Sequence, residues 1–136
     1  MLSYYDRNGF GVPGERGGFP EAGLHHDFSH VLADHDTDPV GEIEVAAFTS
    51  GYSRHRPFYV VLFAVMIFSA GIDVRPTAGT GVTRRGILGD PGVARRMFAA
   101  LERGATLEVD LSDRWDTWPY VEMPVEEVRR RIGTAR

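Results

Sequence analysis

Apolar residues recur at helical intervals along much of the chain. Leu24, Phe28 and Val31 are spaced four and three residues apart, which places them on one face of a helix predicted over residues 21–33. A polar turn follows, and a second helix is predicted over residues 39–52. This second helix carries a stripe of small and apolar residues that suits close packing: Ile43, Ala46, Ala47 and Ser50.

Two dipeptides combine a capping side chain with a proline, a pattern typical of helix starts. Asp38-Pro39 begins the second helix, and Asp90-Pro91 predicts a further helix that ends at about residue 103. Four apolar residues of this further helix are expected to face inward: Val93, Met97, Phe98 and Leu101.

Residues 58–72 are apolar almost throughout and read FYVVLFAVMIFSAGI. As a helix this segment would be about 22 Å long, short of the roughly 30 Å hydrocarbon core of a membrane. We therefore predict a buried central helix and not a membrane span. A helix that lines an apolar ligand cavity is a special case of that prediction.

Three remaining segments complete the predicted organisation. Residues 1–20 are rich in glycine and aromatic residues, so we expect an irregular N-terminal arm, and residues 73–89 read as a long Gly-rich linker. A last helix is predicted over residues 124–132. The predicted fold is all-α, with about five helices in one domain over residues 21–136, packed around the apolar helix at 58–72.

Composition excludes several kinds of chemistry. The net charge of −4, from 15 basic and 19 acidic side chains, argues against a dedicated nucleic-acid binder. The absence of cysteine excludes disulfides, thiolate metal ligands and cysteine nucleophiles. All basic residues are arginine, so Schiff-base chemistry and a phosphate-binding lysine are also excluded. The first residues lack a basic stretch followed by an apolar one, so we expect a cytoplasmic protein, at most peripheral to the inner face of the membrane.

The most informative cluster of residues is His26, Asp27, His30 and Glu42. Two histidines four residues apart lie on one face of a helix, with Cβ atoms about 5–6 Å apart. Both imidazoles can then reach one divalent cation, at about 2.0–2.1 Å if it is zinc. Glu42 returns beside His30 if the turn at residues 34–38 folds the two helices antiparallel.

This donor set suits more than one metal. Imidazoles and carboxylates without a thiolate are typical of zinc, iron, cobalt or manganese sites. Three protein ligands would leave a position open for water or substrate, as in catalytic sites. The alternative is that His26 and His30 are ordinary histidines and that Glu42 is favoured in the first turn of a helix by the helix dipole. His35 and His55 are interpreted as surface or packed residues.

The spacing of the cluster resembles a known family signature. His26-Asp27-x-x-His30, eleven residues and then Glu42 match the H-D-x-x-H-x11-E motif of the Coq4 family of ubiquinone-biosynthesis proteins. The resemblance covers roughly residues 23–133. Its further matching pieces stand in the same order, at residues 41–48, 100–104, 114–118 and 124–129.

The resemblance implies an all-helical protein with a divalent metal, usually zinc, bound by His26, Asp27, His30 and Glu42. It implies oxidative decarboxylation, with hydroxylation at ring carbon C1, of a prenylated, carboxylated aromatic compound whose tail lies in a hydrophobic cavity. Asp27 or Glu42 would handle a proton. Asp27 is a ligand, a partner that orients His26, or a general base, because adjacent helical residues point about 100° apart. Members of the family usually carry a sizeable helical region before the motif, whereas this chain has only about 20 irregular residues there, so part of the cavity is expected either to be missing or to come from a second copy in a homodimer.

Two classes of function remain open after these observations. The first is a metal-dependent enzyme, a lyase of quinone or prenyl-lipid biosynthesis. The second is a non-catalytic lipid or quinone carrier that organises other biosynthetic enzymes, with a structural metal. A phosphohydrolase of the His-Asp type is disfavoured. It needs another histidine upstream of the His-Asp pair and an aspartate well downstream, and the only upstream histidine, His25, is immediately adjacent, which is the wrong spacing.

Overall fold

Helices make up every regular element of the part of the chain that the structure describes, which confirms the all-α prediction. The structure is a computed structural model and describes residues 1–136 except 17, 19–20, 55–56, 73–84, 112–114 and 134–136. The α-helices are α1 (Leu2–Asn8), α2 (Leu24–Ala33), α3 (Pro39–Tyr52), α4 (Pro57–Ser69), α5 (Val93–Ala105) and α6 (Val125–Ile132). Three short 3-10 helices are η1 (Glu21–Gly23), η2 (Ile87–Gly89) and η3 (Trp118–Tyr120).

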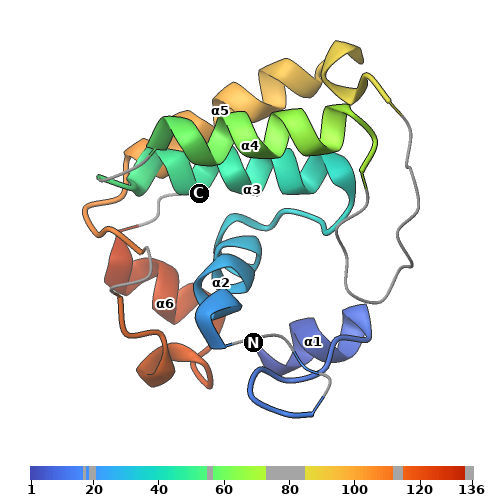
Figure 1. Ribbon diagram of the computed structural model, residues 1–136. Coiled ribbons are helices and arrows are strands. Elements are labelled where there is room, and N and C mark those ends of the chain that lie inside the picture. The colour runs from blue at the N-terminus through green and yellow to red at the C-terminus, as the bar shows by residue number, and fades with distance from the viewer. Residues whose placement is uncertain (17, 19–20, 55–56, 73–84, 112–114, 134–136) are drawn as a thin grey trace.

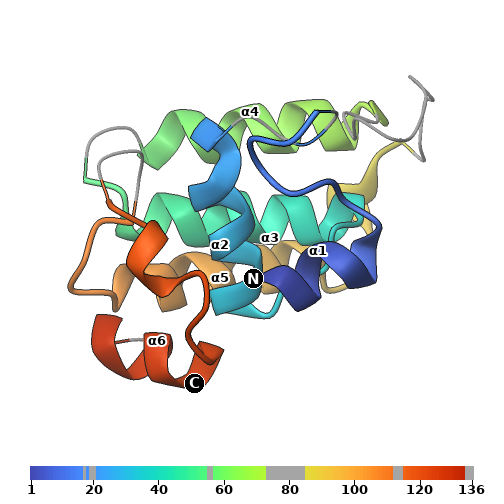
Figure 2. The same cartoon turned by 90° about the horizontal axis from the view of Figure 1, so that it is seen from below.

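Helix α3 is the element around which the others pack. Figure 1 shows that the axes of α3, α4 and α5 are roughly aligned, and Figure 2 shows α3 between α4 and α5, both of which it contacts. Helix α2 crosses these three helices, and α1 and α6 lie on either side of α2 (Figure 1). Ile43, Val45, Ala47 and Phe48 of α3 are completely buried. The two histidines of α2 are thereby held against the first turn of α3.

Two glycines let α3 and α5 approach closely. A Cβ atom added to Gly104 would lie 2.0 Å from the carbonyl oxygen of Phe48, and one added to Gly51 would lie 2.3 Å from that of Leu101. Any side chain at either position would force the helices apart. The two glycines therefore set the short separation between α3 and α5.

The prediction of a buried central helix at 58–72 is corrected by the structure. The helix exists as α4, and Ala64 and Phe68 are buried against α3. However, Tyr59, Phe63 and Met66 are 72%, 66% and 62% exposed. A helix that is apolar on all faces carries no periodicity to tell which face is buried. No helix among the described residues is long and apolar enough to cross a membrane.

The two predicted cap-plus-proline starts differ in outcome. Asp38 caps α3 as predicted, because its Oδ1 accepts a hydrogen bond of 2.7 Å from the backbone N–H of Gly41. The start predicted at Asp90 is wrong, because α5 begins at Val93 after Gly92, which has a φ of 88°. Asp90 instead ends the short helix η2.

The inward face of α5 also differs from the prediction at one residue. Val93 and Ala100 are buried and Met97 packs against the core, but Phe98 is 57% exposed. Phe98 lies about 100° around the helix from Met97, which turns it away from α3. Helix α6 has its predicted form, because it ends at Gly133, with a φ of 77°, and buries Val128 and Ile132.

The predicted irregular arm at residues 1–20 is wrong at its start. Leu2–Asn8 form helix α1, and Tyr4 and Tyr5 are buried in a small cluster with Leu24 of α2. Of the predicted linker at 73–89, residues 73–84 lie outside the described residues, and its last residues form η2.

Candidate metal centre

Three of the four predicted ligands converge on one point. His26 and His30 project from α2 toward Glu42, which stands in the first turn of α3. The Nε2 atom of His26 lies 3.3 Å from Glu42 Oε2, and the Nε2 atom of His30 lies 3.3 Å from Glu42 Oε1. The two Nε2 atoms are 3.2 Å apart. The polar turn after α2 therefore returns the carboxylate to the histidines, as the sequence predicts.

These distances fit the donor spacing of a tetrahedral metal site. Ligands at about 2.0–2.1 Å from a tetrahedral zinc ion are about 3.3 Å from one another. The N···N and N···O separations in this cluster are 3.2 and 3.3 Å. The residues therefore fit a divalent ion bound by two imidazoles and one carboxylate, with a fourth position open.

His30 is the more rigidly held of the two histidines. Its side chain is 1% exposed, whereas the side chain of His26 is 39% exposed and lies at the rim of the site. The Nδ1 atom of His30 lies 3.3 Å from the backbone carbonyl oxygen of His35. Because a carbonyl only accepts, Nδ1 must carry the proton in this hydrogen bond, and a neutral His30 then has its lone pair on Nε2. Metal-binding histidines usually have such a partner.

Charge at the site favours a cation. Burial by itself would raise the pKa of Glu42, but hydrogen bonds and charges from His26 and His30 outweigh it and lower that pKa to about 2. Burial would likewise lower the pKa of His26, but the hydrogen bond and charge of Glu42 raise it overall. Glu42 is therefore ionised at neutral pH and could supply negative charge to a divalent ion.

Asp27, the fourth predicted ligand, is not among the three converging donors. It is buried, and its Oδ2 accepts a hydrogen bond of 2.7 Å from the hydroxyl of Tyr5 in α1. Burial raises the pKa of Asp27 even though the hydrogen bond from Tyr5 opposes this change. Asp27 thus joins α1 to α2 directly beside the ligands.

Helix α1 adds a residue that the sequence analysis missed. The ring of Tyr4 stacks on the imidazole of His30, with centroids 6.0 Å apart and planes inclined by 28°. The Tyr4 hydroxyl is buried and has no hydrogen-bond partner among the described residues. The sequence did not predict this contact, because the apolar pattern of so short a segment does not distinguish a helix from an irregular arm.

An apolar cavity of about 760 Å³ opens beside the ligands. His26 and Glu42 form part of its wall, and Ala46 and Thr49 of α3 continue it. Most of the remaining wall comes from α4: Tyr59, Leu62, Phe63, Met66, Ile67 and Phe68. The exposed face of α4 is thus partly the wall of an open apolar cavity.

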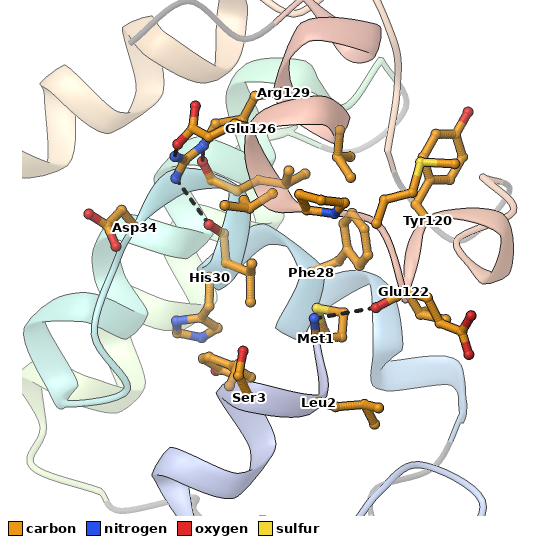
Figure 3. Close-up of a pocket in the computed structure, with 18 of the residues that line it drawn as sticks. Met1, Leu2, Ser3, Phe28, His30, Asp34, Tyr120, Glu122, Glu126 and Arg129 are labelled. Carbon is orange, nitrogen blue, oxygen red and sulfur yellow. Dashed lines mark hydrogen bonds and ion pairs between the residues drawn. The ribbon is translucent and has the colours of Figure 1, made fainter.

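A second cavity, of about 1060 Å³, is lined by residues of α1, α2 and α6 and of the segments next to them. Figure 3 shows His30 in its wall, beside Ser3 of α1 and facing the same space as Phe28. Charged residues at its edge include Asp34, Glu122 and Arg129 (Figure 3). His30 thus lines this second cavity, whereas His26 and Glu42 line the first, and of these two cavities the one beside α4 is mainly apolar.

His35 is a packed histidine next to the site. Burial and the neighbouring charge of Arg103 lower its pKa to about 4, although the charge of Glu44 opposes this shift. His35 is therefore neutral at pH 7.

Comparisons of the chain with protein-family models, curated proteins and solved structures find no match. What the protein does is consequently inferred from its residues and their geometry.

Proposed function

We propose that His26, His30 and Glu42 bind a divalent metal ion, most suitably zinc, at the centre of an enzyme that acts on a carboxylated aromatic ring with an apolar tail. The observation that carries this proposal is the convergence of three donor atoms at the wall of an apolar cavity. The reaction would be the one that the Coq4 resemblance implies, oxidative decarboxylation at ring carbon C1.

The overall reaction replaces a ring carboxyl group by a hydroxyl group. From the carboxylate, carbon dioxide leaves and dioxygen supplies the hydroxyl oxygen, while the second oxygen atom becomes water with two electrons from an external reductant and three protons. A bound divalent ion would act as a Lewis acid toward the carboxylate or an adjacent ring oxygen. The protein must supply a rigid ligand frame, a proton-handling group and a dry pocket.

Each candidate residue suits one of these roles. Buried His30 and ionised Glu42 would form the fixed part of the ligand frame, and half-exposed His26 would complete it next to the cavity. Both oxygens of Glu42 face imidazoles, so the proton-handling role falls to Asp27. Burial raises the pKa of this carboxyl group, and its hydrogen bond from Tyr5 holds it beside the candidate ligands, so Asp27 is placed to give up or accept a proton there.

The cavity beside α4 suits the tail of such a substrate. Its volume of about 760 Å³ is within the usual range for sites that bind small molecules. Its wall is formed mainly by apolar side chains, while His26 and Glu42 stand at one end. A ligand with a polar ring and an apolar chain would therefore place the ring at the metal and the chain along α4.

Metal content and turnover test this proposal together. The protein purified without added metal should contain close to one equivalent of zinc, iron, cobalt or manganese, and His30→Ala should lose it. His25→Ala, which removes the neighbouring imidazole, should keep the metal. Conversion of a prenylated hydroxybenzoate to its decarboxylated, hydroxylated product should be lost in His30→Ala. Absence of bound metal, or of turnover with every metal tested, would overturn the enzyme proposal.

The open and mainly apolar character of the cavity also favours a second function, a carrier for a prenylated lipid or quinone. In that case the metal would grip the head group and no bond would change. Native mass spectrometry separates the two functions. A prenyl lipid that co-purifies in stoichiometric amount and remains unaltered on incubation with dioxygen and a reductant would favour the carrier.

The exposed side chains of Tyr59, Phe63 and Met66 suggest where an apolar tail would enter. A tail of this kind resides in a membrane, so we propose that α4 contacts the inner membrane surface while the tail is transferred. Flotation with phospholipid vesicles should recover the protein, and Phe63→Ser should reduce recovery. A dimer in solution that Phe63→Ser dissociates, without binding to vesicles, would instead assign this face to a second copy.

A further inference from the structure

The imidazole of His30 is tied to the turn that follows α2. Asp34 ends the helix with a φ of 55°, and the backbone N–H of His35 donates to the carbonyl of His30 at 3.1 Å. In the opposite direction, the Nδ1–H group of His30 donates to the carbonyl of His35 at 3.3 Å. The direction of the His30 ring therefore depends on where the backbone of His35 is held.

The side chain of His35 is held at both ring nitrogens. Its Nε2 atom lies 3.2 Å from the guanidinium of Arg103, and its Nδ1 atom lies 3.2 Å from Oε2 of Glu44. A guanidinium only donates and a carboxylate only accepts. The proton of the neutral ring is therefore on Nδ1, and His35 bridges Arg103 and Glu44.

Both partners of His35 are themselves fixed. Glu44 is buried and accepts two hydrogen bonds from Arg96, of 2.5 and 2.8 Å. Arg103 also donates to the carbonyl of Ala33, in the last turn of α2, and its guanidinium lies 5.5 Å from the centre of the Phe48 ring. The turn after α2 is thus clamped between α3 and α5.

We propose that Arg103 and His35 are positioning residues for His30: they hold the carbonyl that accepts its Nδ1–H, so that Nε2 faces Glu42. This inference rests on the proposed metal centre. Neither side chain touches the ion position, so both act only through His30. Removing the outer partner of a metal-binding histidine typically weakens metal binding by about 10–100-fold.

The chain supplies a matched control in Arg129. This arginine of α6 donates to the carbonyls of Leu32 and Val31, at 2.9 and 3.2 Å, and so binds the same end of α2 one turn away from His35. Arg103→Gln and Arg129→Gln should both loosen that helix end. Only Arg103→Gln should disturb the carbonyl of His35.

The test measures cobalt and zinc affinity by competition with a chromophoric chelator. Arg103→Gln should bind at least about tenfold more weakly than the wild type, and Arg129→Gln should stay within about twofold. His35→Asn, which keeps a donor for Glu44 and loses the acceptor for Arg103, should resemble Arg103→Gln. Equal losses in both arginine variants, or unchanged affinity in Arg103→Gln, would overturn the inference. Far-UV circular dichroism establishes that each variant is folded.

A second readout does not need a bound metal. Long-range ¹H–¹⁵N NMR of the metal-free protein should show a slowly exchanging proton on Nδ1 of His30. In Arg103→Gln this exchange should be at least about tenfold faster, and in Arg129→Gln it should be unchanged. If the wild type bound no metal, the proposed function would fail while this readout still decided the positioning role. An Nδ1 proton that exchanges equally fast in all three proteins would refute it.

Discussion

Replacing Glu42 by glutamine in the metal-free protein should destabilise the fold by an amount that depends on pH. Burial alone would raise the pKa of Glu42, but its contacts with His26 and His30 lower it from 4.5 to about 2. One pKa unit corresponds to about 1.4 kcal/mol. The ionised carboxylate therefore contributes on the order of 3 kcal/mol while His26 is protonated.

The sign of the dependence follows from both partners. Glu42, with a lowered pKa, stabilises the fold above its unfolded-state pKa of about 4.5, and this contribution is lost as the pH falls toward 2. His26, with a raised pKa, stabilises the fold below about pH 6.5, and this contribution is lost as the pH rises through its folded-state pKa. The cost of Glu42→Gln should therefore be largest between about pH 4.5 and 6.5.

Zinc should reverse this dependence. A metal ion competes with protons for the imidazoles, so zinc should stabilise the wild type most above about pH 7. At a free zinc concentration 100 times the dissociation constant, the gain is about 2.7 kcal/mol. A Glu42→Gln variant that binds tenfold more weakly would gain about 1.3 kcal/mol less under the same conditions.

Urea denaturation measures the free energy of unfolding in four conditions: at pH 5.5 and at pH 8.5, each with a chelator or with buffered zinc. Glu102→Gln, at an exposed position of α5, is the control and should leave the free energy of unfolding unchanged in all four. The reasoning would be refuted if the cost of Glu42→Gln in chelator were equal at both pH values. It would also be refuted if zinc stabilised the variant as much as the wild type.

Four further predictions follow from contacts at the site and between the helices. Tyr5→Phe leaves buried Asp27 without its hydroxyl donor and should lower the free energy of unfolding by about 1–3 kcal/mol in urea. Tyr4→Phe, in which the lost hydroxyl has no partner among the described residues, should leave it unchanged or slightly higher. Gly104→Ala places a Cβ atom 2.0 Å from a backbone oxygen of α3 and should lower the melting temperature, with a cost of about 1–3 kcal/mol or more. Phe63→Ser, in the cavity wall, should weaken binding of a fluorescent prenyl probe without loss of stability, whereas Phe98→Ser, exposed on α5, should leave probe binding intact.

The parts of the site that the sequence predicts are those fixed by short-range geometry. The four-residue spacing of His26 and His30 places them on one helix face, and the cap at Asp38 sets where α3 begins. Glu42 then falls in the first turn of α3, which the intervening turn brings back to α2. Local rules suffice here because all three donors lie within 17 residues of one another.

The features that the sequence did not predict depend on distant contacts. A helix as short as α1 is marginal alone and forms here because Tyr4 and Tyr5 are buried against α2. Asp27 accepts a hydrogen bond from Tyr5 and does not join the three converging donors, and no rule of sequence spacing predicts that pairing. The partial exposure of α4 could not be predicted either. It depends on which helices pack closely, and the close contact at Gly104 joins α3 to α5, which are far apart in the sequence.

The two acidic residues of α3 connect the candidate metal centre to the contacts that hold His35. Glu42 and Glu44 are two positions apart, so they point about 200° apart around the helix. Glu42 faces the histidines of α2, and Glu44 faces His35 and Arg96. Because the backbone of His35 also accepts the hydrogen bond from His30, one turn of α3 fixes both the carboxylate donor and the direction of the buried imidazole. The spacing of the donor atoms is therefore set by the core of the fold, although the cavity beside them is open.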